Sequence, residues 1–107
     1  MPGSFGITVA RKPNHVEVAP RGEIDLAVAG ELRECLLELL AGGDDRIVVD
    51  LEGVEFLDST GLGVLVGGLK RARERGGDLQ VRDPRPQVRS VFEITGLAPV
   101  FGLDENG

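Results

Sequence analysis

An unbroken apolar segment near the middle of the chain most strongly limits the folds available to it. Ile47, Val48 and Val49 follow one another without a polar residue, as in strands that are covered on both faces inside an α/β sheet. Apolar residues recur at helical spacing before this segment, over 29–40, and after it, over 62–72. Strand and helix therefore alternate, which predicts an α/β fold with a mostly parallel sheet.

Further elements are predicted towards both ends of the chain. Alternating apolar residues indicate an antiparallel N-terminal hairpin, and prolines and glycines delimit the C-terminal elements. These elements are strands over 5–10, 16–19, 79–81 and 99–101, and a helix over 86–95. The length fits one domain over 1–107, with a frayed tail over 103–107. We therefore expect a single α/β domain with a mixed sheet, an antiparallel N-terminal hairpin and flanking amphipathic helices.

Composition argues against several classes of partner. The chain has 12 Lys and Arg residues against 18 Asp and Glu residues, a net charge of −6. This balance disfavours binding to a nucleic-acid backbone or to an anionic membrane surface. An aromatic content of 4%, without Trp or Tyr, leaves little surface for base stacking. We therefore expect neither a nucleic acid nor a membrane as partner.

Cysteine use and the N-terminal segment indicate the cellular compartment. Cys35 is the only cysteine, which excludes an internal disulfide and a cysteine-rich zinc site, and no metal or cofactor is expected. A fold without disulfides suits the reducing cytoplasm. The first six residues lack a signal-peptide pattern, and the stretch 61–69 is too short to cross a bilayer. The sequence thus predicts a cytoplasmic protein.

The segment Asp58-Ser59-Thr60-Gly61-Leu62-Gly63 leads into the second predicted helix. A serine at such a junction is exposed and fixed in direction. It also lies close to the backbone N–H groups at the positive end of the helix dipole. This position favours a phosphate group, so Ser59 is the main candidate functional residue.

Spacing argues against enzymatic uses of this segment. A phosphate-binding loop that starts at Gly63 would need lysine where Leu69 stands, and a dinucleotide fingerprint would need glycine at Val66. A nucleophile elbow would need glycine in place of Leu57. The only histidine, His15, lies in the predicted hairpin turn, so the serine lacks a base. We expect no catalytic activity, and a small enzyme that uses the serine is kept as an alternative.

A purely structural role is another alternative for this segment, because Asp58, Ser59 and Thr60 are all suited to cap a helix. Two features favour a functional role. Three such residues in a row exceed the need of one helix end. In addition, Gly61 and Gly63 each weaken the first helical turn by roughly 1 kcal/mol relative to alanine. Small residues at that cost suggest the close approach of another molecule.

The order and spacing of several motifs resemble those of the anti-sigma factor antagonists, the small STAS-domain proteins of bacteria. The 58–63 segment is similar to the phosphorylation motif of that family, and Gly22-Glu23-Ile24-Asp25 is similar to its Gly-Glu-Leu-Asp segment. Further motifs that fall in the expected order are Gly76-Gly77, Pro86-Gln87-Val88 and Thr95-Gly96-Leu97. The resemblance covers residues 5–103 and implies a STAS-like α/β domain.

The resemblance also implies a protein that switches partners. The unmodified form would bind an anti-sigma factor that is a serine kinase, and would so release a sigma factor. The kinase would phosphorylate Ser59, and a serine phosphatase would reverse the modification. The residues carried over as partner-binding are Asp58, Thr60, Gly61, Gly63, Glu23 and Asp25. An alternative with the same fold is an unphosphorylated STAS subunit of a membrane transport complex, which would dock through the same segment.

Other residues have simpler explanations. Without the resemblance, Glu23 and Asp25 are explained as solvated loop acids, with Asp25 as a cap of the first helix. Cys35 fits a packing role better than that of a reactive thiol. The basic residues over 70–75 suit the negative end of the second helix.

Overall fold

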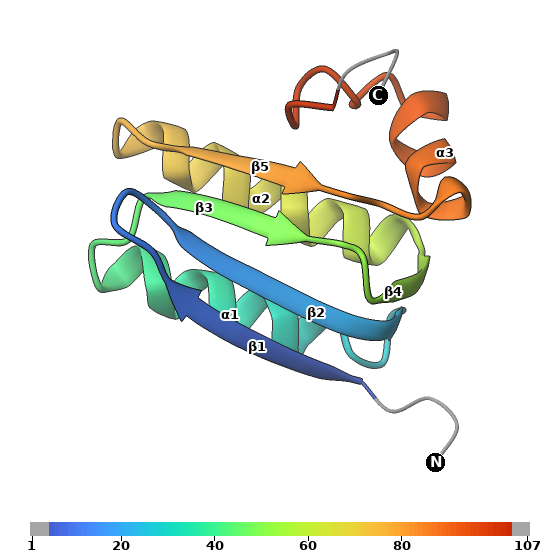
Figure 1. Ribbon diagram of the computed structural model, residues 1–107, viewed down its shortest axis with the longest axis horizontal. Coiled ribbons are helices and arrows are strands. Elements are labelled where there is room, and N and C mark those ends of the chain that lie inside the picture. Colours follow the sequence, from blue (N-terminus) through green and yellow to red (C-terminus); the bar gives the residue numbers. More distant parts are fainter. Residues whose placement is uncertain (1–4, 104–107) are drawn as a thin grey trace.

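The computed structural model describes residues 5–103. Figure 1 shows two helices, α1 and α2, against one face of a five-stranded sheet, and a third helix, α3, at one end of that sheet. The elements are β1 (Gly6–Arg11), β2 (Val16–Ile24), α1 (Ala29–Ala41), β3 (Arg46–Asp50), β4 (Val54–Leu57), α2 (Ser59–Glu74), β5 (Asp78–Arg82) and α3 (Pro86–Ile94). The buried apolar side chains of the sheet and helices form one continuous core. The predicted α/β domain with flanking amphipathic helices is thus confirmed.

The sheet is mixed and mostly parallel, as predicted. Four of its strands lie in the order β1-β2-β3-β5. The fifth strand, β4, pairs with β2. The β1–β2 hairpin is antiparallel, whereas the pairs β2–β3, β2–β4 and β3–β5 are parallel. β2 is long because it pairs with two neighbours: residues 16–18 pair with β3, and residues 22–24 pair with β4, with a register shift between Gly22 and Glu23.

Two sequence predictions about strands are wrong. No strand is predicted over 54–57, where β4 forms, and a strand is predicted over 99–101, where the chain folds into turns. The apolar character of the second segment serves the core. Phe101 packs edge-on against Phe92 of α3 with the ring centroids 5.4 Å apart. A hydrogen bond of 3.0 Å from the Val81 N–H to the Phe101 oxygen ties the segment to β5.

The C-terminal segment is packed further than predicted. Leu103 is buried, and its N–H donates a hydrogen bond of 2.8 Å to the carbonyl oxygen of Ala98. The first residue of the predicted tail therefore belongs to the core. The rest of that tail, 104–107, lies outside the described residues, so the frayed tail stays a prediction there.

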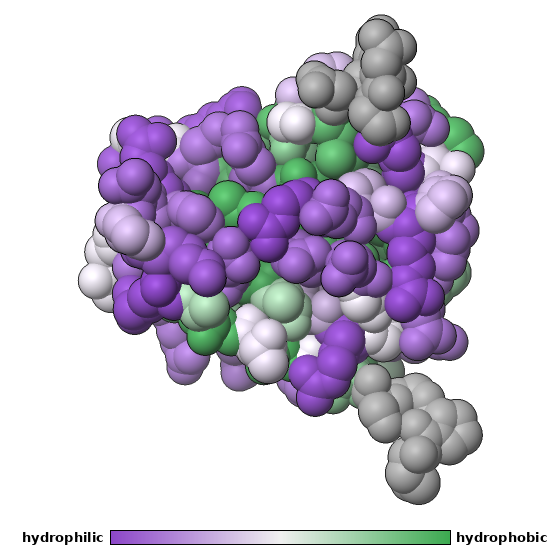
Figure 2. All heavy atoms as spheres, in the orientation of Figure 1, coloured by the Kyte–Doolittle hydropathy of each residue, from purple (hydrophilic) through white to green (hydrophobic). Residues whose placement is uncertain are grey.

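One face of the sheet carries no helix over residues 5–103 (Figure 1). Ile47 and Val49 of β3 are buried in the core, whereas Val48 points to the other face and is half-buried. Figure 2, drawn from the same direction, shows mainly hydrophilic side chains over this face. The expectation that this strand is covered on both faces is therefore wrong, because α1 and α2 both pack on the same side.

An ion-pair network joins three strands on this open face. Arg82 of β5 donates hydrogen bonds to Glu17 of β2 and to Asp50 of β3, with N–O distances of 3.1 and 3.2 Å. The two carboxylates raise the pKa of Arg82. The hydrogen bond from Arg82 lowers the pKa of Glu17, with burial acting in the opposite direction and a bond to His15 adding to the decrease.

The start of α2 packs on the ends of β2 and β4 at a distance that requires glycine. A methyl group at Gly61 would lie 2.7 Å from Ile24 Cγ2 and 2.7 Å from Leu57 Cδ1, well inside the optimal separation of carbon atoms. A methyl group at Gly63 would meet no atom of residues 5–103 within 4 Å. The core itself therefore explains the small residue at Gly61, whereas the structure offers no internal reason for Gly63.

The two glycines should respond oppositely to alanine. Gly61→Ala should destabilise the protein by about 1–3 kcal/mol, because the methyl group overpacks the core. Gly63→Ala should stabilise it by about 1 kcal/mol or less through helix propensity. Urea unfolding of both variants and the wild type measures the two effects. Equal free energies of unfolding for the two variants would contradict this account of the packing.

The stabilising effect of Arg82 should depend on pH. Because the folded pKa of Glu17 lies below its ordinary value of 4.5, the pair stabilises the fold above that value. This contribution is lost as the pH falls through the folded pKa. Arg82→Gln should therefore lower the free energy of unfolding at about pH 7, and the difference from wild type should shrink towards about pH 3. A difference that does not change with pH, measured by urea unfolding, would argue against the ion pair.

Candidate functional site

Ser59 is the first residue of α2 and is exposed. The residue before it, Asp58, is the N-cap: its Oδ1 accepts a hydrogen bond of 2.9 Å from the Gly61 N–H. Its carbonyl oxygen accepts another, of 2.9 Å, from the Leu62 N–H. Asp58 therefore fills the capping role by itself. Over residues 5–103 the Ser59 hydroxyl makes no hydrogen bond, so it is not needed to hold the helix end.

The pairing of β2 with β4 brings a second acidic loop beside this helix start. Ile24 and Leu57 are register partners, and the Asp58 N–H donates a hydrogen bond of 3.2 Å to the Ile24 oxygen. Asp25 and Asp58 thus follow the carboxyl ends of two neighbouring parallel strands. The backbone contact between Asp58 and Ile24 holds the two strand ends next to each other.

Asp25 organises the turn that leads into α1. Its Oδ1 accepts a hydrogen bond of 3.0 Å from the Ala27 N–H, and its carbonyl oxygen accepts one of 2.9 Å from the Ala29 N–H. The N-cap of α1 is Val28, which makes no side-chain cap. Asp25 therefore holds the turn before the helix and does not cap the helix directly, unlike the structural alternative proposed from the sequence.

Three carboxylates line this edge of the sheet, and we call Glu23, Asp25 and Asp58 the acidic edge. Glu23 is exposed on β2 opposite Phe56, while Asp25 and Asp58 are half-buried. Within the described part of the chain, none of the three carboxylates makes an ion pair. The negative charge of the acidic edge is therefore left for solvent or for a partner.

Two exposed apolar residues beside the acidic edge are not identified by the sequence analysis. Leu26 follows Asp25 and is 76% exposed, and Phe56 lies opposite Glu23 and is 47% exposed. The sequence signal that could have identified Leu26 is its position before the helical apolar stripe, which begins at Ala29. An apolar centre with a polar rim is the usual anatomy of a protein–protein interface.

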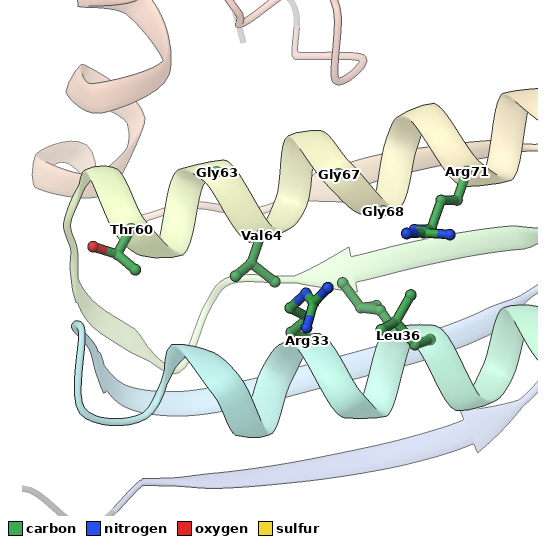
Figure 3. Close-up of a pocket in the computed structure, with 9 residues that line it drawn as sticks. Arg33, Leu36, Thr60, Gly63, Val64, Gly67, Gly68 and Arg71 are labelled. Carbon is green, nitrogen blue, oxygen red and sulfur yellow. The ribbon is translucent and has the colours of Figure 1, made fainter.

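The remaining predicted site residues, Thr60 and Gly63, lie on the side of α2 that faces α1. Both line a groove between the two helices, and Figure 3 shows Thr60 at the end of the groove nearest the start of α2. The structure therefore distributes the predicted residues over two adjoining surfaces. Gly61 belongs to neither surface, because it is buried on the side of α2 that faces the core.

Over residues 5–103, the geometry gives Ser59 no catalytic partners. His15 precedes the nine-residue strand β2, whereas Ser59 follows the strand paired with the far end of β2, so roughly 25 Å separate them. His15 instead lies 3.4 Å from Glu17. Burial raises the pKa of the Cys35 thiol, which disfavours the nucleophilic thiolate. A packing role for Cys35 fits this environment.

Two further kinds of feature are absent from the part of the chain that the structure describes. No group of three or more His, Cys, Asp or Glu side chains over 5–103 is arranged to hold a metal ion. In the same range, no helix combines the length and the apolar character required to span a membrane.

Comparisons with known proteins match nearly the whole chain. The sequence model of the family described as "Mlab, STAS domain" matches residues 7–102. An anti-sigma-B factor antagonist of Bacillus subtilis is 35% identical over 100 residues, which cover 94% of this chain and 91% of the relative. The crystal structure of an anti-sigma factor antagonist from Mycobacterium paratuberculosis has a TM-score of 0.82 and 30% identity, over 98% of this chain and 89% of that one.

A third similar protein, the Bacillus anti-sigma factor antagonist SpoIIAA, has been solved in two forms. The unphosphorylated form has a TM-score of 0.78 and 25% identity, covering 88% of this chain and 84% of its own. The phosphorylated form has a TM-score of 0.71 and 25% identity, covering 90% of this chain and 86% of its own.

These relatives are antagonists of anti-sigma factors, which agrees with the expectation that this chain regulates by binding. The matched regions include the Glu23–Asp25 strand end and the 58–63 segment. On the fold, the full-length sequence match and the structural matches, the chain belongs to the STAS-domain family of anti-sigma factor antagonists.

Proposed function

We propose that phosphorylation of Ser59 controls the binding of this antagonist to an anti-sigma factor. The unmodified chain binds an anti-sigma factor that is also a serine kinase, and a sigma factor is released. Phosphorylation ends the binding, and a serine phosphatase restores it. The observation that carries the proposal is an exposed hydroxyl without a structural bond, at the start of α2 and beside the acidic edge.

The free protein is suited to carry a phosphate at this position. A phosphoserine has about −1.5 to −2 charges, and the positive end of a helix dipole stabilises negative charge by roughly 0.3–1 kcal/mol. Because Asp58 already caps the helix through Oδ1, modification of the neighbouring hydroxyl breaks no bond of the fold. The phosphorylated chain therefore keeps its structure.

The complex responds differently from the free protein. Docking of a partner over Ser59 would desolvate the phosphate beside the three carboxylates of the acidic edge. An uncompensated buried charge costs about 3–5 kcal/mol, which is roughly a hundred- to several-thousand-fold in affinity. The similarity of this chain to both forms of SpoIIAA supports a block that needs no large rearrangement.

Substitutions of Ser59 test the charge argument. Ser59→Ala should bind the anti-sigma factor about as tightly as the wild type, because the hydroxyl is exposed and holds nothing. Ser59→Asp places one of the two phosphate charges at the site and should weaken binding by about tenfold or more. Isothermal titration calorimetry measures both. Wild-type affinity for Ser59→Asp would refute the electrostatic block.

Incubation with the anti-sigma kinase and ATP tests the modification itself. Mass spectrometry should show the gain of one phosphate in the wild type and in Thr60→Ala, and no gain in Ser59→Ala. Thr60 is the matched control because it is the adjacent exposed hydroxyl on the same helical turn. Binding without any phosphate gain would favour the alternative of an unphosphorylated docking subunit.

Leu26 should act as an apolar anchor of the same interface. Leu26→Ser should weaken binding to the anti-sigma factor by about tenfold, as expected for a contact near an interface centre. The free energy of unfolding should change by less than about 0.5 kcal/mol, since the side chain is largely exposed. Val9→Ser on β1, also exposed, is the control and should leave the affinity unchanged. Equal affinities for the two variants would exclude Leu26 from the interface.

A further inference from the structure

A groove of about 260 Å³ lies between α1 and α2. Figure 3 shows one arginine from each helix reaching into it: Arg33 from α1 and Arg71 from α2. Apolar side chains of both helices also line it: Leu36 lies between Arg33 and Arg71, and Val64 lies on the Thr60 side of Arg33 (Figure 3). The groove therefore combines an apolar centre with positive charge.

The two arginines have no anionic partner over residues 5–103. Arg11, Arg73 and Arg82 each pair with a carboxylate of this chain. Arg33 and Arg71, in contrast, make neither an ion pair nor a hydrogen bond within that range. Two cations facing the same space, in a chain whose net charge is −6, indicate that the groove is complementary to an acidic partner.

Two glycines of α2 also line the groove, and no contact within residues 5–103 explains their size. A methyl group at Gly63 or at Gly67 would meet no atom of the described residues within 4 Å. At Gly68 a methyl group would contact Leu79 at 3.1 Å and Leu36 at 3.2 Å, so that glycine is explained by the core. Gly63 and Gly67 are one helical turn apart, and glycine there weakens the helix. Their effect is to let another backbone approach α2 closely.

We propose that an acidic amphipathic helix of the anti-sigma factor docks in this groove. The groove is open and smaller than most sites that bury a small molecule, whereas an amphipathic helix laid in an apolar groove is a recurrent mode of recognition. The helix places carboxylates against Arg33 and Arg71 and an apolar face against Val64. The proposal rests on the proposed function, because it names the part of that partner which extends the contact beyond Ser59.

The groove and the acidic edge together define the orientation of the partner. Thr60, which lines the groove, is adjacent in sequence to Ser59, so the two surfaces are continuous around the start of α2. The partner must therefore offer negative groups to the groove and, at the acidic edge, only enough positive charge to match the carboxylates there, which leaves an added phosphate on Ser59 uncompensated. Charge patterns of opposite sign on neighbouring patches fix the register of a complex and exclude the reversed orientation.

Charge reversal on α2 provides a matched test of this docking. Arg71→Glu should weaken binding to the purified anti-sigma factor that binds the wild type by about tenfold or more. Lys70→Glu is the control, because it makes the same charge change one residue away, at an exposed position that does not line the groove. It should change the affinity less than about twofold. Equal effects of the two substitutions would overturn the proposal, because they would indicate a long-range charge effect.

Alanine at the open glycines separates docking from folding. Gly67→Ala should raise the melting temperature through helix propensity and yet weaken binding, because the methyl group adds bulk to the lining of the groove. Gly30→Ala on α1, where a methyl group also meets nothing within 4 Å, should raise the melting temperature and leave the affinity unchanged. If Gly67→Ala, Arg33→Glu and Arg71→Glu all bind with wild-type affinity, the proposal that a partner helix docks in the groove is overturned.

Ser59→Asp, measured in the same titrations, distinguishes failure of the groove from failure of the proposed function. If Ser59→Asp weakens binding while all groove variants bind like the wild type, the phosphorylation switch stands and the groove proposal fails. If the groove variants weaken binding while Ser59→Asp does not, the groove stands and the phosphorylation switch fails.

Discussion

The parallel pairing between the end of β2 and β4 is the contact on which the functional surface depends. Ile24 and Leu57 are register partners, and the Ile24 oxygen accepts the Asp58 N–H across the pair. Both side chains are buried against the first turn of α2, at a distance that leaves room only for glycine at 61. Two loops that are distant in sequence are thereby held side by side, and Ser59 is presented between the strand pair and the helix.

The first turns of α2 separate two surfaces of opposite charge. The acidic edge lies on the side of the strand ends, and the groove with Arg33 and Arg71 lies on the side of α1. A phosphate on Ser59 adds negative charge to the acidic side alone. The modification can therefore oppose docking at the acidic edge while the groove is left unchanged. The proposed switch then needs no change in fold.

Local features of the site are predictable from sequence because a few consecutive residues specify a helix start. The N-cap at Asp58 and the exposure of Ser59 are of this kind. The hydrophobic pattern does not predict β4, because its four residues do not alternate between buried and exposed positions. Val54 and Leu57 are buried, whereas the two residues between them are exposed. Likewise, the apolar segment that contains Phe101 has the composition of a strand, but its ring completes the core against α3.

The sequence by itself determined the α/β class, the antiparallel hairpin and the position of the serine at a helix start, because hydrophobic period and capping chemistry are properties of neighbouring residues. Only the tertiary structure decided which charges meet. Asp25 joins Asp58 because β2 pairs with β4, and Arg33 joins Arg71 because α1 packs on α2. It also distinguished Gly61, which the core requires, from Gly63, which the core does not. These outcomes depend on contacts between segments far apart in the chain, which no local pattern encodes.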